Sequence, residues 1–583
     1  MSKLNIDQKT VKELFSGKKT NFLIPDYQRP YAWGETECMT LWEDLFLFSF
    51  PNNDYEDFDS DSDEYFLGPI VTFKNDNGQM EIIDGQQRLT TLMLLLRAFY
   101  DRYGNMRDDK ALKTSRSIEQ CIWKTDEFGD ADKSILKIDS EVASDEDKEE
   151  FLNILRTGIV SDKEDSTYAN NYRFFQKKIE EFLNMYPDWF SFLPIRIMNN
   201  CILLPIEAES QDTALRIFST LNDRGKPLSD ADIFKAQFYK YYSDKGEKDS
   251  FMEDWKDLEM LCNKIFPAST GSALDEIFTR YMYYERARKG IRASTTEALR
   301  KFYEKDGYAL LKNDETFDNL IDLAQFWKDI LQQNKERFSE RVLKRLYVLN
   351  YAPNGMWTYF VSVYYMSYRE DGGALNDEHF YQFLNKITAF IWAYAITNPG
   401  VNTLRTPVYP EMINLVNKDP VDFNEFLFNE AKVNNLFRNY DFSNYRKITK
   451  SMLTWWAFQD PEQPLLLLND KMDIEHIYAK RRQEKDHTLS DPKNIESLGN
   501  KSLLEKGINI SASDYRFDDK RKYYLGGYTT RRNQVKEGTK IKELRDLATN
   551  AADFIEDDII NRHDEIISSF IEFMGYNGLL INE

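Results

Sequence analysis

Four residues near the C-terminus combine side chains that can hydrolyse a phosphodiester. Asp473, Glu475 and His476 lie in a short segment with strand-like alternation, and Asn500 follows on a Gly-Asn turn 24 residues after the histidine. Histidine, with an ordinary pKa of about 6.5, can take a proton from water at neutral pH. Carboxylate and amide oxygens are ligands that Mg²⁺ and Mn²⁺ prefer. The cluster therefore predicts metal-assisted attack of water, with His476 as the general base.

The assignment of ligands follows from the chemistry of the same four residues. We expect Glu475 and Asn500 to bind the metal, and Asp473 to orient the histidine or to add a ligand. Strict alternation along a strand would place His476 on the opposite face from Glu475, so the site requires a twist or bulge at that point. The alternative for Asn500 is a purely structural role in its turn.

Cationic side chains are concentrated around this cluster. Residues 471–545 contain 18 Lys and Arg against 12 Asp and Glu, a local charge of +6 in a chain whose net charge is −22. The overall negative charge disfavours indiscriminate DNA binding, whereas the local excess favours a nucleic-acid contact surface. The predicted DNA-binding residues are Lys520, Arg521 and Lys522, on a predicted helix. A basic patch without a partner is the alternative.

A second polar cluster begins at residue 84. The segment EIIDGQQRLTTLMLLLRAFY predicts a strand that ends at Ile83, a turn at Asp84 and Gly85, and then an amphipathic helix. Backbone N–H groups at a helix N-terminus bind phosphate, and Arg88 in the first turn can add a bidentate contact. The alternative is that Asp84 caps the helix while Arg88 is solvated.

Two other polar segments can contribute to the same site. DYQRPYAW supplies Gln28 and Arg29 beside aromatic rings, and STLNDRGKPLSD supplies Asn222 and Arg224 in a turn. Neither Gly-Lys pair of the chain has the Walker A spacing, so a nucleotide site here is of a different kind. The predicted nucleotide-binding residues are Asp84, Gly85, Gln86, Gln87, Arg88, Gln28, Arg29, Asn222 and Arg224.

Length and composition indicate a multidomain globular protein. The chain has 583 residues, 42% of them hydrophobic, which is enough for several cores. Its four cysteines are widely spaced and form no C-x-x-C pair, which excludes a zinc ribbon and a disulfide framework. The N-terminal segment lacks the apolar core of a signal peptide, and the apolar runs are too short to span a membrane. We therefore expect a cytoplasmic protein with no membrane partner.

Hydrophobic periodicity divides the chain into three predicted domains. Residues 1–245 mix strands and helices, residues 246–455 are mostly amphipathic helix, and residues 456–583 return to short strands, Gly turns and a final helix. Strands are expected at FLGPIVTF and MEII, and an acidic loop from about residue 125 to 150. The expected fold class is α+β multidomain, with an all-α middle region.

The motifs resemble those of one family. IPDYQRPYAW, IIDGQQRLTTL and STLNDRGKPLSDADIFKA resemble the N-terminal domain of the GmrSD-type, modification-dependent (type IV) restriction endonucleases. DIEHI followed by LGNKSLLEKGIN resembles the C-terminal HNH domain of the same family. The resemblance covers roughly residues 1–245 and 456–560. One departure is Ala479, because the family usually has proline at this position.

The resemblance implies a fold and a ligand for each end of the chain. For residues 1–245 it implies a ParB-like α/β domain whose DGQQR motif binds NTP, with hydrolysis as a further expectation. GTP, ATP, UTP and CTP are not distinguished. For residues 456–583 it implies a ββα-metal (HNH) nuclease domain with Mg²⁺ or Mn²⁺ as cofactor and modified phage DNA as substrate. Paired cuts in a duplex favour a homodimer.

These expectations combine into one predicted function and two alternatives. We expect a phage-defence DNA endonuclease whose NTP-binding N-terminal domain controls a metal-dependent HNH phosphodiesterase. The first alternative is a nucleotide-switched DNA- or partner-binding regulator with an inactive HNH remnant. The second is a helical scaffold with two inert ends. Strand scission separates the prediction from both alternatives.

Overall fold

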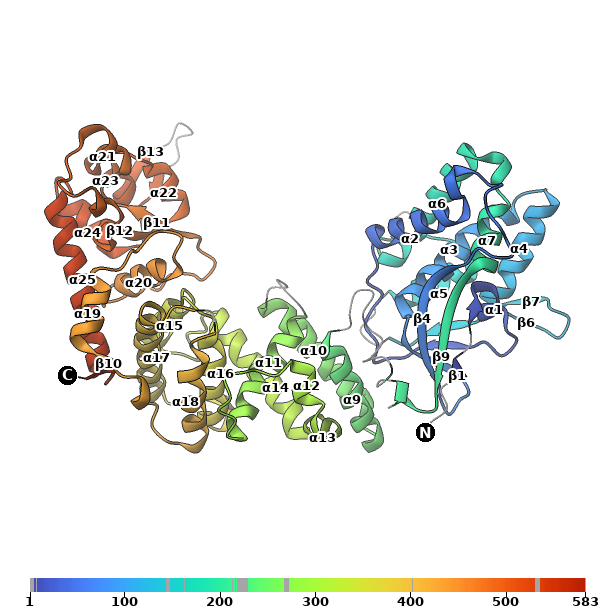
Figure 1. Ribbon diagram of the computed structural model, residues 1–583, viewed down its shortest axis with the longest axis horizontal. Helices are drawn as coiled ribbons and strands as arrows, with labels where there is room; N and C mark the ends of the chain where they lie inside the picture. The colour runs from blue at the N-terminus through green and yellow to red at the C-terminus, as the bar shows by residue number, and fades with distance from the viewer. Residues whose placement is uncertain are drawn as a thin grey trace. The chain divides into compact units, whose positions relative to one another are not determined.

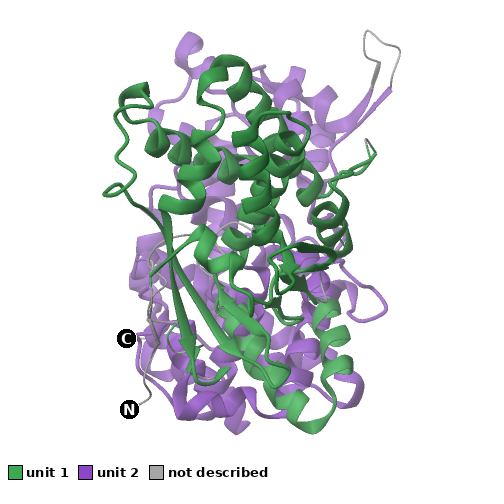
Figure 2. Cartoon of the chain, turned by 90° about the vertical axis from the view of Figure 1, so that its right-hand side faces the viewer, with its two compact units in different colours: residues 1–257 green, residues 258–583 purple. Residues whose placement is uncertain are grey.

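The computed structural model describes residues 5–6, 8–142, 147–161, 163–211, 213–214, 217, 229–266, 272–400, 402–529 and 535–581. The chain divides into two units, residues 1–257 and residues 258–583 (Figure 2). Sheets lie toward both ends of the chain, with a run of helices between them (Figure 1), which confirms the expected α+β multidomain class. In the described residues, no helix has the length and the apolar composition that a membrane span requires.

The first unit contains a mixed sheet of seven short strands. Its order is β1-β9-β4-β5-β3-β8, and β2 also pairs with β9. The central strands β4 and β5 are antiparallel, whereas β9 runs parallel to β4 and β3 runs parallel to β5. The strands are β1 (Asn5–Ile6), β2 (Lys9–Thr10), β3 (Phe22–Ile24), β4 (Tyr65–Lys74), β5 (Met80–Asp84), β8 (Ile138–Ser140) and β9 (Cys201–Ala208).

Helices pack around this sheet and supply most of its core. The central helix, α3, is buried over most of its length because its leucines continue around the helix, and it packs against α4 and α6. The helices of this unit are α1 (Val11–Ser16), α2 (Glu35–Ser49), α3 (Gln86–Gly104), α4 (Asp109–Ile122), α5 (Lys148–Thr157), α6 (Thr167–Met185), α7 (Phe192–Asn200) and α9 (Asp230–Lys245).

The predicted acidic loop at residues 125–150 is wrong in part. This stretch contains β7 (Ala131–Leu136), which pairs with β6 (Trp123–Thr125), and β8, which forms an edge of the main sheet against β3. At β8 the acidic side chains are compatible with a strand because the exposed Asp139 and Glu141 alternate with the buried Ile138, Ser140 and Val142.

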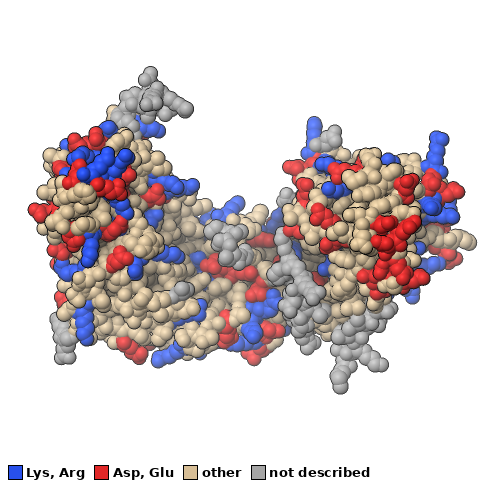
Figure 3. All heavy atoms as spheres, turned by 45° about the horizontal axis from the view of Figure 1, so that its top comes forward, with Lys and Arg blue, Asp and Glu red and all other residues tan. Residues whose placement is uncertain are grey.

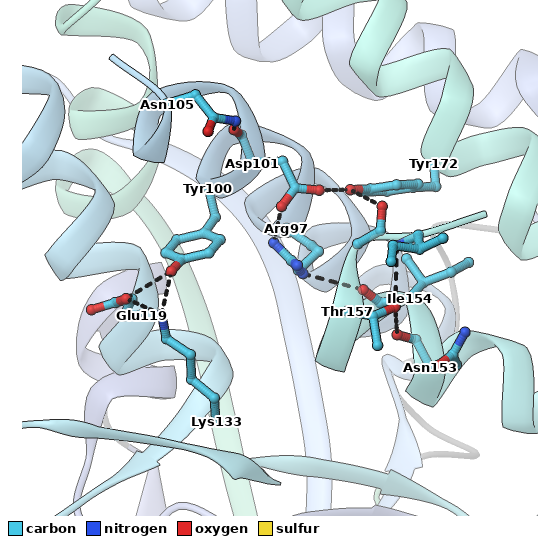
Figure 4. A network of polar contacts seen from close by, with 12 residues as sticks. Arg97, Tyr100, Asp101, Asn105, Glu119, Lys133, Asn153, Ile154, Thr157 and Tyr172 are labelled. Atoms are coloured by element: carbon cyan, nitrogen blue, oxygen red, sulfur yellow. Dashed lines mark hydrogen bonds and ion pairs between the residues drawn. The ribbon is translucent and has the colours of Figure 1, made fainter. Parts of the chain in front are cut away.

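A buried polar network joins α3 to α5 and α6 (Figure 4). Arg97 forms an ion pair with Asp101 one turn later, and its Nε donates to the backbone carbonyl of Ile154 in α5 at 3.2 Å. The hydroxyl of Tyr172 in α6 donates to the same carboxylate. Because a buried guanidinium without partners is strongly destabilising, these contacts hold the three helices in one arrangement.

The second unit begins with a helical region, as the periodicity predicts. Its long helices pack pairwise, for example α11 against α16 and α15 against α17. The helices that follow α9 are α10 (Lys248–Ile265), α11 (Ala273–Arg288), α12 (Leu299–Tyr303), α13 (Lys305–Tyr308), α14 (Asp314–Leu331), α15 (Glu340–Leu349), α16 (Met356–Tyr368), α17 (Asp377–Thr397), α18 (Arg405–Asn417), α19 (Glu430–Arg438) and α20 (Lys447–Ala457).

The C-terminal region has two antiparallel strands followed by helices. The strands β11 (Met472–His476) and β12 (Lys501–Glu505) are separated by a long loop that contains α21 (Lys480–Asp486), and α22 (Lys506–Ala512) follows directly. The remaining elements are α23 (Phe517–Leu525), β13 (Gly526–Thr529), β14 (Val535–Glu537), α24 (Lys542–Asn550), α25 (Glu556–Tyr576) and β15 (Leu580–Ile581), which pairs with β10 (Phe428–Asn429).

The β10–β15 pair and the packing of α25 on α17 and α19 tie the C-terminal region to the helices before it. For this reason residues 258–583 form one unit, although the sequence predicts a separate helical domain at 246–455 and a nuclease domain at 456–583.

Candidate active site

The strand pair β11–β12 carries the predicted catalytic cluster at one end. Glu475 lies opposite Ser502 and His476 lies opposite Lys501, and the register does not shift along the pair. Alternation is therefore kept, and β11 has no bulge at the point where the prediction required a twist or bulge. The side chains of Glu475 and His476 consequently have separate sets of partners.

Glu475 is buried against α23. Its Oε1 accepts hydrogen bonds from Lys520 Nζ at 2.7 Å and from the hydroxyl of Tyr524, and the residue is only 3% exposed. Lys520 Nζ also donates to the backbone carbonyl of His476 at 2.6 Å. Burial raises the pKa of Glu475, and the adjacent ammonium opposes that rise. This buried ion pair fixes α23 to the strand.

Asn500 holds the loop that enters β12. Its Oδ1 accepts the backbone N–H of Tyr478 at 2.7 Å, and its Nδ2 donates to the carbonyls of Tyr478 and Ile495. The residue is fully buried. Its amide is therefore satisfied on both sides, which corresponds to the structural alternative for this residue.

Glu475 and Asn500 do not fit a shared divalent cation as they are placed, which corrects the predicted ligand pair. Both side chains already accept strong hydrogen bonds, and they do so from different elements. In the part of the chain that the structure describes, no three His, Cys, Asp or Glu side chains are grouped so that they can hold a metal ion. Asp473 is half-buried and interacts electrostatically with Lys450 of α20. The geometry thus assigns no reaction step to a metal.

His476 faces the loop between the two strands. Its Nε2 is buried without a hydrogen-bond partner among the described residues, and the Oε2 atom of Glu496 lies 3.5 Å away. The same carboxylate is bound by Lys480 and by Lys501, whose Nζ is 2.7 Å from Oε2. Partial burial would raise the pKa of Glu496, but the two lysines lower it to about 2. Glu496 is therefore a carboxylate wherever the protein is folded.

The imidazole of His476 is neutral at physiological pH. Burial, and then the charges of Lys501 and Lys480, lower its pKa to about 4, whereas Glu496 opposes that shift. The anionic oxygen of Glu496 near the buried Nε2 favours the tautomer that is protonated at Nε2, which leaves the lone pair on Nδ1 to accept a proton. The side chain is 14% exposed, which leaves it accessible at its edge.

Sequence reasoning missed Glu496, Lys480 and Lys501. Glu496 lies in the short 3-10 helix Pro492–Glu496, 20 residues after His476, and no local spacing marks it. Lys501 had a usable signal, because a residue directly opposite a catalytic strand position is its nearest cross-strand neighbour. Lys480 had a weaker signal in the basic run that follows His476.

Helix α25 positions the loop that carries Asn500. Arg562 donates to the backbone carbonyls of Leu498, Gly499 and Lys501, and it forms an ion pair with Glu543 of α24 at 2.6 Å. At Gly499 the helix backbone is so close that a Cβ would overlap the carbonyl oxygen of Ile559. Glycine is therefore required here for α25 to pack on the loop.

The three predicted DNA contacts have different environments. Lys520 is wrong as a DNA contact, since it is 1% exposed and pairs with Glu475. Arg521 is partly buried and its Nε donates to the carbonyl of Ala548, which links α23 to α24. Lys522 is exposed. Figure 3 shows basic side chains gathered at one end of the second unit, interspersed with acidic ones.

At the N-terminal motif, two glutamines bind the chain segment around Arg29. Gln87 Oε1 accepts the backbone N–H of Ala32 at 2.7 Å, and its Nε2 donates to the carbonyl of Pro30. Gln86 Nε2 donates to the carbonyl of Arg29 at 3.1 Å. Gln28 Nε2 in turn donates to the carbonyls at the end of β5. All three of these predicted nucleotide-binding side chains are buried; Gln86 and Gln87 join the loop to α3, and Gln28 joins it to β5.

The other residues of this motif surround the start of α3. Gly85 has φ +93°, which favours glycine, and α3 has no side-chain cap. Asp84 and Arg88 are half-buried and interact electrostatically: burial raises the pKa of Asp84 and lowers that of Arg88. Arg88 Nη1 donates to the carbonyl of Pro69 at 2.9 Å. The structure brings Arg29 into the same electrostatic environment as Asp84. Asn222 and Arg224 lie outside the described residues.

Comparison with protein families gives a match at each end of the chain. Residues 11–239 match the family model described as GmrSD restriction endonuclease, N-terminal domain. Residues 428–569 match the family model described as GmrSD restriction endonucleases, C-terminal domain. The second match begins at β10 and so includes α19, α20 and the whole β11–β12 region. No curated protein matches the chain.

Proposed function

The chain belongs to the GmrSD restriction endonuclease family, and on that basis we propose that it is a phage-defence nuclease that cuts DNA at the His476 site. The observation that carries this proposal is the neutral, partly exposed imidazole beside the anionic Glu496. The two family matches support DNA as the substrate. Modified phage DNA remains the specific substrate that we propose.

In the proposed mechanism, His476 and the neighbouring loop residues position and transfer the proton of the attacking water. The negative charge of Glu496, 3.5 Å from Nε2, favours the His476 tautomer that is protonated at Nε2, while Nδ1 takes a proton from the attacking water. Lys480, which is half-exposed, can contact a DNA phosphate as well as Glu496. Lys501 is buried; it holds the carboxylate, and its charge lowers the pKa of His476.

We also propose that cleavage depends on a divalent metal, because the resemblance to HNH nucleases implies it. When bound, Mg²⁺ or Mn²⁺ would stabilise charge on the phosphate. Glu475 and Asn500 do not fit that ion as placed, so the proposal assigns no residue to it. The dependence is checked by chelation followed by titration of each metal.

A regulatory role for the N-terminal unit is the second part of the proposal. The uncapped start of α3 together with Arg88 supports binding of a nucleoside triphosphate. The half-buried Asp84 adjoins this cation. We further propose that the protein hydrolyses the bound nucleotide and that it forms a homodimer.

A cleavage panel tests the proposal. Plain, glucosylated, methylated and phosphorothioated DNA are incubated with the protein, with and without Mg²⁺ or Mn²⁺ and each NTP. We expect cleavage of at least one modified DNA, lost in His476→Ala and retained in His487→Ala, because His487 is an exposed residue at the end of α21. Equal cleavage by the two variants would refute the site.

The alternative is a nucleotide-switched DNA-binding regulator, and Ala479 at the usual proline position is the observation that favours it. It predicts that nucleotide raises the melting temperature, that Arg88→Ala removes this shift, and that no strand is cut under any metal.

A further inference from the structure

The second unit has a large cavity away from the β11–β12 pair. It has a volume of about 1130 Å³ and lies between α15, α17 and the end of α25. Its wall includes Arg345, Tyr381, Asn385, Phe573 and Tyr576. Ligand pockets for small molecules usually occupy several hundred cubic ångströms, so this cavity can hold a molecule of nucleotide size.

Arg345 is unusual among the buried arginines of the protein. It is 6% exposed, and its Nε and Nη1 have no hydrogen-bond acceptor among the described residues. The hydroxyl of Tyr381 is the polar group that interacts with it, and its guanidinium lies 5.2 Å from the ring centroid of Phe573. By contrast, a carboxylate or backbone carbonyl binds each of Arg97, Arg196 and Arg562.

An arginine cannot relieve this burial by losing its proton at physiological pH. Burial does lower the pKa of Arg345, which shows that the fold gives its charge little compensation. The carboxylate of Glu378 in the cavity wall is already paired with Arg341 at 2.6 Å. Asp419 also lines the cavity, but it does not bind the Arg345 guanidinium. A buried cation of this kind is destabilising, and an anion bound in the cavity would compensate its charge.

The wall supplies two further features that a nucleotide would use. Asn385 Oδ1 is buried and has no donor in the described chain, so it can accept a hydrogen bond from a hydroxyl or a ring amine. Lys386 lines the same cavity and adds a positive charge. The rings of Tyr381 and Phe573 provide the apolar surface that a base contacts.

We propose that this cavity binds a nucleotide-sized molecule through its phosphate group, with Arg345 as the residue that recognises the anion. Guanidinium is the side chain best suited to phosphate, because it offers several N–H donors in one plane. This site is separate from both the His476 site and the start of α3. It gives the helical region a ligand of its own.

Calorimetric titration of the full-length protein tests this site with inorganic phosphate, AMP and adenosine. We expect AMP to bind and adenosine not to bind, with affinity for AMP roughly 10–100-fold weaker in Arg345→Met. Arg438→Met is the matched control, since Arg438 is an exposed arginine of α19 that does not line the cavity, and this variant should leave binding intact. Binding must also survive Arg88→Ala, which excludes the N-terminal motif.

Each other outcome is decisive. Binding of phosphate alone, lost in Arg345→Met, would show that the anion site is real but that the ligand is a free phosphate and not a nucleotide. Equal binding of adenosine and AMP, or AMP affinity unchanged in Arg345→Met, overturns the proposal. Arg345→Met should fold and melt no lower than the wild type, because it removes an unpaired buried charge. Its failure to fold would mean that the guanidinium has a partner within the chain, which also contradicts the site.

Discussion

At the scale of single residues, the charges around His476 set its proton affinity. Two lysines and burial keep the imidazole neutral, and one carboxylate acts in the opposite direction. A base with a pKa of about 4 is in its reactive form throughout the physiological range, although it binds a proton weakly. Lys480 and Glu496 are partly exposed, so either residue can be substituted without disturbing the core.

Lys480→Ala should raise the pKa of His476, because it removes a nearby positive charge. The measurement is an NMR titration of the ring, which is simple in a protein with four histidines. The acid limb of the cleavage profile should move toward neutral pH in the same variant. Lys485→Ala, an exposed lysine on the same helix, is the control and should leave the titration unchanged.

The direction in which stability changes with pH follows from the lowered pKa of His476. The folded pKa of about 4 lies below the unfolded value of about 6.5. The unfolded chain therefore binds a proton first, and this contribution to stability is complete above pH 6.5 and is lost as the pH falls toward 4. Lys480→Ala should narrow the pH range over which this contribution to stability is lost, because it raises the folded-state pKa of His476 toward the unfolded value. An unchanged range would mean that Lys480 does not act on the imidazole.

Lys520→Met should destabilise the protein by about 3–5 kcal/mol, because it leaves the buried Glu475 carboxylate without its cation. Lys522→Met, on the exposed side of the same helix, should change the free energy of unfolding by no more than about 0.5 kcal/mol. Urea denaturation of the two variants measures the difference. Equal, small effects would mean that Lys520 is a surface residue after all.

Part of this residue chemistry was visible in the sequence. His476 could be singled out by its type and its acidic neighbours. Lys520 was misread because the run Lys520–Lys522 resembles a basic surface, although Phe517, Lys520 and Tyr524 share one buried helix face. Asn500 was misassigned because a side chain that binds backbone groups and one that binds a metal have the same residue type.

At the scale of elements, local patterns predicted what local forces determine. The strands β4 and β5 and the helix α3 were expected from alternation, a Gly turn and 3.6-residue periodicity, and the structure confirms them. The edge strand β8 was missed because its pairing with β3 joins residues more than a hundred positions apart. Packing of α25 on the Asn500 loop is long-range in the same way.

Gly499→Ala should destabilise the protein by about 1–3 kcal/mol or more, because the new methyl group would meet the backbone of α25. Gly507→Ala is the matched control, since it lies in α22 and a Cβ added there would have no atom within 4 Å. That substitution should stabilise the helix by up to about 1 kcal/mol. Thermal unfolding of both variants separates the two effects, and a stable Gly499→Ala protein would contradict the close packing of α25.

At the scale of the whole molecule, the chain divides into two compact units, residues 1–257 and 258–583, whereas the three domains at 1–245, 246–455 and 456–583 stay a prediction from hydrophobic periodicity. The sequence pattern indicates where strands are followed by helices. It does not indicate that β10 and α25 join the C-terminal strands to the preceding helices. The family match that begins at residue 428 includes this junction. The nuclease-like strands are therefore supported by the helical region, and a fragment that starts at residue 456 should fold poorly.

The most direct test of the account is chemical rescue of His476→Ala by imidazole in a single-turnover DNA cleavage assay. Removal of the side chain leaves a gap beside Glu496 that free imidazole can enter. We predict that the variant is folded and inactive, and that cleavage returns in proportion to the concentration of neutral imidazole. Cleavage by His476→Ala at the wild-type rate without imidazole would contradict the assignment of this residue as the general base.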